Sequence, residues 1–165
     1  MAATSAAQAP SRMTQWLNEI KAQREDDNAL KPYADAAGVA ARLMKTNRRL
    51  GQGQADWLAQ HWAQPGPDGQ WRILGDSAHK VINPYLFRVE EALAMYQRIS
   101  APVLAVEASD DSLSQWWKGK YTLAEFHERL KSVPHLEKAM IEDAGHMLHH
   151  DQPHALARIL ETFLD

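Results

Sequence analysis

Residues 137–153 read Glu137-Lys-Ala-Met-Ile-Glu-Asp-Ala-Gly-His-Met-Leu-His-His-Asp-Gln-Pro153, and they are the part of the sequence that indicates the fold most clearly. A short apolar run stops at Asp143-Ala-Gly145, and His146 follows directly after this turn. Pro153 then opens a new helix. This order predicts a strand that ends in a loop carrying a histidine. A histidine suits acid–base work there, because an unperturbed imidazole titrates at roughly pH 6.5.

The pattern Ile141-Glu-Asp-Ala-Gly-His146-Met-x-x-His-x-x-Pro153 is followed by an amphipathic helix. Together they resemble the last strand, the catalytic-histidine loop and the last helix of the α/β-hydrolase superfamily. The resemblance implies that His146 is the general base of a hydrolase. The simpler alternative is a strand-to-helix turn with a surface histidine.

A second strand is predicted at Ala101-Pro-Val-Leu-Ala-Val106, a compact apolar run typical of a strand buried on both faces of a parallel sheet. Glu107-Ala-Ser-Asp-Asp111 follows it. In the α/β-hydrolase family the corresponding strand ends in a Gly-x-x-Asp turn whose aspartate is the acid of the triad. Here an alanine replaces the glycine, Asp111 matches the acid, and Asp110 is the reserve candidate. The alternative role for Asp111 is to cap the helix that follows.

A crossover helix is predicted between these two strands. Thr122-Leu-Ala-Glu125 forms a capping box, and the helix it opens carries the chain from the Val103 strand to the Leu136 strand. A right-handed βαβ unit makes these strands parallel and adjacent. Asp111 and His146 then both follow carboxyl ends of strands, which is where open parallel sheets assemble their sites.

Short tryptophan-rich helices with hardly any strand are predicted for the first hundred residues. One of these helices is expected to run from an N-cap at Asp35 to Asn47. By resemblance this region is similar to the helical cap of an α/β-hydrolase, which makes Trp57, Trp62 and Trp71 candidates for the lining of a substrate pocket. The alternative for each is ordinary core packing, which is usual for aromatic residues at helical spacing.

The expected fold class is therefore α/β, a partial α/β-hydrolase fold. A flexible tail (residues 1–12) and a mostly helical, cap-like region (13–98) precede a C-terminal segment of the hydrolase core (99–165). That segment comprises a two-strand parallel βαβ unit and a C-terminal helix.

Composition narrows the classes of function. The 165 residues are 45% hydrophobic, and 18 basic and 21 acidic residues give a net charge of −3, which argues against a nucleic-acid partner. There is no cysteine, so a thiolate nucleophile and a cysteine metal site are excluded. No signal peptide or membrane-spanning run is recognised, and the cytoplasm is the default location. No cofactor and no metal are implied.

A triad hydrolase also needs a nucleophile on a strand-to-helix elbow and donors for the oxyanion, and neither is found in this sequence. The resemblance covers nearly the whole chain but only the C-terminal half of a complete hydrolase. The resemblance implies a small ester, an epoxide or a similar apolar molecule as substrate. We also expect the chain to be inactive alone, with the missing N-terminal half as a partner.

Three other interpretations remain open from the sequence. Ile73-Leu-Gly-Asp-Ser77 is similar to the nucleophile block of SGNH lipases, so Ser77 and His146 would complete a triad within the chain. The chain is alternatively a non-catalytic interaction protein. The third alternative is a metal module, in which binding would be incidental because Pro153 interrupts the helical spacing of the candidate ligands. These ligands are His146, His149, His150, Asp151 and His154.

Overall fold

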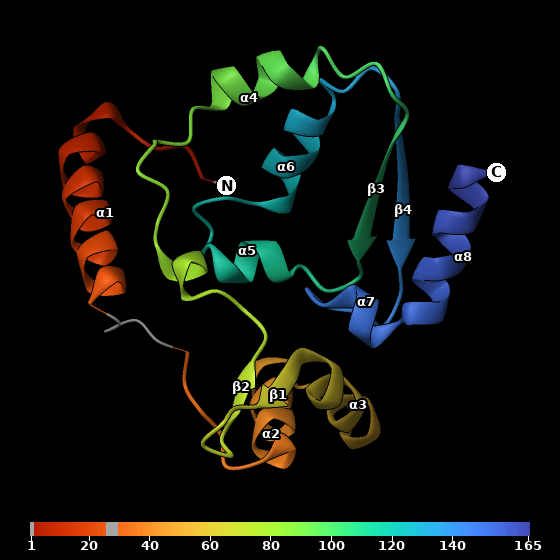
Figure 1. The fold of residues 1–165 in the computed structure, drawn as a ribbon. Helices are drawn as coiled ribbons and strands as arrows, with labels where there is room; N and C mark the ends of the chain where they lie inside the picture. Colours follow the sequence, from red (N-terminus) through yellow and green to blue (C-terminus); the bar gives the residue numbers. More distant parts are fainter. Residues whose placement is uncertain (1, 26–29) are drawn as a thin grey trace. The chain divides into compact units, whose positions relative to one another are not determined.

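The computed structural model describes residues 2–25 and 30–165, and the chain forms two compact units (Figure 1). One unit is Ser5–Leu86, and the other is Phe87–Asp165 together with the N-terminal residues up to Thr4. Across the described ranges, no helix has both the length and the apolar character needed to cross a bilayer.

The unit Ser5–Leu86 is mainly helical and includes one small antiparallel hairpin. A turn at residues 66–70 joins the two hairpin strands, and Gly69 adopts a positive φ of 76° there. Glycine tolerates this left-handed conformation without steric cost. The elements are η1 (Ala6–Gln8), α1 (Ala9–Arg24), α2 (Ala36–Thr46), α3 (Gln52–Trp62), β1 (Ala63–Pro65), β2 (Trp71–Ile73) and η2 (Ser77–Lys80).

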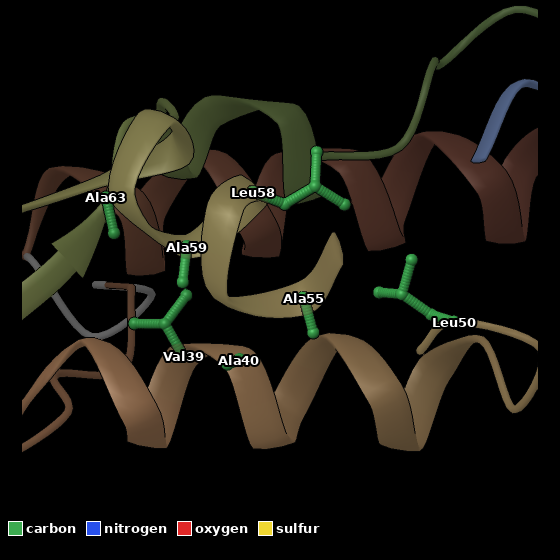
Figure 2. Packing of buried hydrophobic residues seen from close by; sticks show 7 residues of the cluster. All are labelled: Val39, Ala40, Leu50, Ala55, Leu58, Ala59 and Ala63. Carbon is green, nitrogen blue, oxygen red and sulfur yellow. The ribbon is translucent and has the colours of Figure 1, made fainter. Parts of the chain in front are cut away.

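The core of this unit lies between α2 and α3 (Figure 2). Small side chains at the contact let the two helix backbones approach closely, and the hairpin strand β2 packs against the same cluster. Asp35 caps α2, because its carboxylate accepts a hydrogen bond from the amide of Gly38 at 2.8 Å. The predicted cap and helix are thereby confirmed. The buried cluster is Val39, Ala40, Leu50, Ala55, Leu58, Ala59 and Ala63.

Helix α1 is held to the segment after η2 by polar contacts. The Arg12 guanidinium donates to the carbonyl of Asn83 at 2.8 Å, and the Glu19 carboxylate accepts from the amide of Ile82 at 2.7 Å. On the same helix, Leu17 remains 55% exposed. Met13 on this helix is 43% exposed as well, so part of the apolar surface of α1 remains uncovered.

The unit Phe87–Asp165 is built around a two-stranded parallel sheet. Strands β3 (Val103–Ala108) and β4 (Leu136–Ile141) pair from Val103 opposite Leu136 to Ala108 opposite Ile141. Two adjacent parallel strands joined through a helical connection confirm the predicted βαβ unit. The helices are α4 (Val89–Tyr96), α5 (Ser112–Trp116), α6 (Leu123–Leu130), α7 (Leu148–Asp151) and α8 (Pro153–Leu164).

Helices α6 and α8 lie on opposite faces of this sheet (Figure 1). Glu107 of β3 contacts α6, whereas Leu104 of the same strand lines a groove with α8. Side chains separated by an odd number of residues on a strand point to opposite faces, so the two helices sandwich the strands. Thr122 caps α6 through a 3.2 Å bond from the Glu125 amide, which confirms the N-cap half of the predicted capping box. The Glu125 carboxylate pairs with Arg129, one turn further along the helix.

Strand β3 differs from the expected strand buried on both faces, because all six of its residues are only half-buried. The amides of Val103 and Ser109 donate to the β4 side at 2.8 and 2.9 Å. Alternate residues of a strand direct their backbone groups to the same side, so those of Leu104, Val106 and Ala108 face away from β4. Within the described ranges no further strand pairs there, which leaves this edge of the sheet open.

The units divide the chain at residues 86 and 87, so α4 belongs with the sheet. Helix α1 begins at Ala9, inside the segment expected to be a tail. It ends at Arg24.

Candidate active site at the carboxyl ends of the parallel strands

The loops that follow β3 and β4 are joined by backbone hydrogen bonds. The amide of Asp110 donates to the carbonyl of Ala144 at 3.1 Å, and the amide of Ser109 donates to the carbonyl of Ile141 at 2.9 Å. The two loops carry the predicted acid and the predicted base. Their attachment therefore places both segments at one end of the sheet, as expected from parallel strands.

His146 lies in a tight turn between β4 and α7. Asp143 adopts a positive φ of 50°, a left-handed conformation in which aspartate is better tolerated than most residues. Ala144 and Gly145 are buried, whereas His146 is exposed. Among the described residues the imidazole of His146 has no hydrogen-bond partner, so its predicted contact with an acid stays a prediction. Catalytic hydrogen bonds are often long or unformed without substrate.

Asp111 acts as the N-cap of α5, which was the alternative role considered for it. Its Oδ1 accepts a hydrogen bond from the amide of Ser114 at 2.9 Å. Hydrogen bonding to Ser114 lowers the pKa of the Asp111 carboxyl, and the nearby His127 adds a smaller effect of the same sign. The carboxylate is thus ionised at neutral pH, which both a cap and a triad acid require.

A histidine–carboxylate pair that the sequence analysis missed lies beside this site. Nε2 of His127 on α6 is 2.6 and 2.7 Å from the two carboxylate oxygens of Glu107 on β3. The Glu107 side chain is only 12% exposed, and a carboxylate removed from water needs such a partner. The available signal was a charged residue directly after the apolar run of the predicted strand, at a position that the observed strand β3 includes.

The short helix α7 is hydrogen-bonded to the His146 loop. Oδ2 of Asp151 accepts a hydrogen bond from the amide of Gly145 at 2.8 Å. His150 is buried, and burial together with the neighbouring His149 lowers the pKa of its imidazole, against a smaller opposite effect of Asp151. His150 is therefore neutral at pH 7 and helps to anchor the helix.

The three tryptophans predicted to line a pocket lie in different surroundings. Trp57 and Trp62 on α3 are 60% and 39% exposed, and the Trp57 ring stacks on His61 with centroids 4.0 Å apart. Trp71 on β2 packs half-buried against the core. A groove beside β2 is lined by Arg72 and Ile73 among others, and none of the three tryptophans belongs to its lining, so their role as a pocket lining stays a prediction.

The structure also shows the surroundings of Ser77 and of the residues considered as metal ligands. Ser77 opens the 3-10 helix η2, whose N-cap is Asp76, and the preceding strand β2 is antiparallel to its neighbour. By the resemblance, an SGNH-type serine follows the first strand of its fold, whereas β2 is the second strand of an antiparallel pair, so this setting gives that alternative little support. Within residues 2–25 and 30–165, no three histidine, aspartate or glutamate side chains are grouped to hold a metal ion.

Comparison with known proteins identifies the fold. No family model matches the sequence. No curated protein matches it either. Among solved structures, a hypothetical protein from Pseudomonas aeruginosa PAO1 matches with a TM-score of 0.78 and 22% identity over 99% of this chain and 55% of that chain. A Mycobacterium tuberculosis esterase matches with a TM-score of 0.66 and 16% identity, over 99% of this chain and 52% of its own.

A thioesterase domain from the curacin biosynthetic pathway matches as well, with a TM-score of 0.71 and 20% identity over 98% of this chain and 52% of that one. The chain has part of an α/β-hydrolase fold. Sequence identities this low show the fold alone. The chain spans about half the length of the solved structures it matches.

Proposed function

We propose that this chain supplies the histidine and the acid of a hydrolase, with His146 as general base and Asp111 as the acid that orients it. The observation that carries the proposal is the junction of their two loops, made by the bond from the Asp110 amide to the Ala144 carbonyl. The fold is shared with an esterase and a thioesterase domain. A small carboxylic ester or a related apolar molecule is the proposed substrate.

In the proposed reaction, His146 accepts and returns the proton in each step. The nucleophile attacks the ester carbonyl while His146 accepts its proton, and Asp111 stabilises the resulting imidazolium. The imidazolium then returns the proton to the departing alkoxide. Water then attacks the covalent intermediate while the same imidazole accepts its proton, and the imidazolium returns this proton to the departing nucleophile as the acid is released. The nucleophile and the oxyanion donors come from a segment outside these 165 residues, because no elbow motif occurs within them.

The open edge of β3 is the proposed attachment site for that segment. Its outward-facing backbone groups at Leu104, Val106 and Ala108 lie in an apolar strand that carries no lysine, proline or bulge to block pairing. A two-stranded sheet is marginal in water, and another strand along β3 would stabilise it.

Hydrolysis is tested by comparing the chain alone with the chain co-expressed with an elbow-bearing segment encoded upstream. With a p-nitrophenyl ester, the chain alone gives the background rate and the complex turns over. His146→Ala then lowers kcat by roughly 10⁴-fold or more. The matched control is His154→Ala, which removes an exposed histidine at the start of α8. Equal turnover in both variants would remove His146 as the base, and turnover by the chain alone that Ser77→Ala abolishes would establish the SGNH alternative.

The edge is tested separately with proline. Val106→Pro removes an amide that faces the open edge, so the βαβ unit still folds but association and turnover are lost. Ala105→Pro is the contrasting variant, because that amide faces β4 and its loss disrupts the sheet itself. Wild-type association by Val106→Pro would show that the partner does not pair with β3.

A further inference from the structure

The loop that carries His146 is held from two directions. On the β3 side, the carbonyl of Ala144 accepts from Asp110 at 3.1 Å, and its amide lies 3.4 Å from the hydroxyl of Ser109. On the opposite side, the amide of Gly145 donates to the Asp151 carboxylate at 2.8 Å. The exposed His146 directly follows Ala144 and Gly145, the two residues that these hydrogen bonds hold.

The Asp151 carboxylate is itself firmly placed. Its own amide donates to the carbonyl of Met147 at 3.0 Å, which closes the turn of α7 around the loop. The preceding residue, His150, is buried with 8% exposure and fixes α7 against the body of the unit. Asp151 therefore reaches the loop from an anchored helix rather than from a free surface.

We infer that Asp151 is a positioning residue for His146, because its carboxylate holds the Gly145 amide and so fixes the backbone from which the imidazole projects. The inference rests on the proposed function of His146. A hydrogen bond to an ionised acceptor is roughly twice as strong as a neutral one. The turn also contains Asp143 at a positive φ, and a backbone in this sparsely populated region persists only when its surroundings hold it.

The first test uses the 165-residue chain by NMR. Asp151→Ala raises the amide exchange rate of Gly145 by roughly 10- to 100-fold, since a hydrogen bond to a charged group is lost. The backbone order parameter at His146 falls from about 0.85 towards about 0.6. Asp151→Asn keeps an oxygen acceptor and retains most of both values. The control Glu161→Ala removes an exposed carboxylate of α8 and changes neither.

The second test uses the active complex of the proposed function. Asp151→Ala lowers kcat by roughly 10- to 100-fold with little change in KM, because a misplaced base affects the chemical step more than substrate binding. Asp151→Asn restores most of the rate. A residue that merely stabilised α7 would lower the melting temperature without changing kcat, and this result would overturn the inference.

The two proposals fail in distinguishable ways. If no complex turns over substrate, the proposed role of His146 is wrong, but the exchange data still decide whether Asp151 holds the loop. Unchanged exchange and order at residues 144–147 in Asp151→Ala would overturn the positioning role even where His146→Ala abolishes turnover.

Discussion

Asp111→Asn separates the two roles that this carboxylate can have, helix cap and triad acid. Asparagine is as good an N-cap as aspartate, because its side-chain oxygen still accepts the bond from the Ser114 amide that Asp111 accepts at 2.9 Å. The free energy of unfolding should therefore change by less than about 0.5 kcal/mol. Asp111→Ala removes the acceptor and should cost about 1 kcal/mol, within a range of roughly 0.5–2 kcal/mol.

Asp111→Asn should also change kcat and the dependence of stability on pH. Replacing the triad aspartate by asparagine typically lowers kcat by roughly 10⁴-fold, because the imidazole is held in the wrong tautomer. The lowered pKa of Asp111 means that the native state binds its proton more weakly than the unfolded state does. Its contribution to stability is then present above the unfolded value of about 3.9 and is lost as the pH falls through the lower native pKa. Asp111→Asn removes this dependence.

Urea unfolding of the isolated chain measures the first effect, and ester hydrolysis by the active complex measures the second. The expected result is near wild-type stability with strongly reduced turnover for Asp111→Asn. Turnover within a few-fold of wild type would refute the reasoning and leave Asp111 as a helix cap alone. Asp110→Asn is then the next variant to measure.

Three further predictions concern stability, each measured by urea unfolding. The lowered pKa of His150 means that its stabilising effect is present above about pH 6.5 and declines as the pH falls towards the native pKa, so His150→Leu should flatten the loss of stability between pH 7.5 and 5.5. Asp143→Val should be about 1–2 kcal/mol less stable than Asp143→Gly, because φ is 50° there, and equal stability would argue against strain in this turn. Glu107→Ala should cost about 1.5–3 kcal/mol, because it removes the acceptor of the bond to His127, and an unchanged midpoint would show that the pair contributes nothing.

Much of the local structure could be predicted because it depends on residues close together in the chain. The cap at Asp35 needs only an acceptor three residues before a free amide, and the cap at Thr122 follows the same rule. The parallel pairing of β3 and β4 follows from a helix between two apolar runs, since a helical crossover is the usual connection between parallel strands. The position of His146 just after a strand is local as well.

The remaining features depend on contacts between segments far apart in the chain. Glu107 and His127 are 20 residues apart and meet only because α6 lies over that face of the sheet. The apolar sequence of β3 predicts a fully buried strand, yet all six residues are only half-buried. Burial depends on which elements pack against a strand, and the sequence of the strand alone does not specify them. Asp111 suits a cap and a triad acid equally well by sequence, and only the folded backbone gives its carboxylate the Ser114 amide as a partner. A short-range pattern specifies which groups are present, whereas the packing of distant segments determines which of them meet.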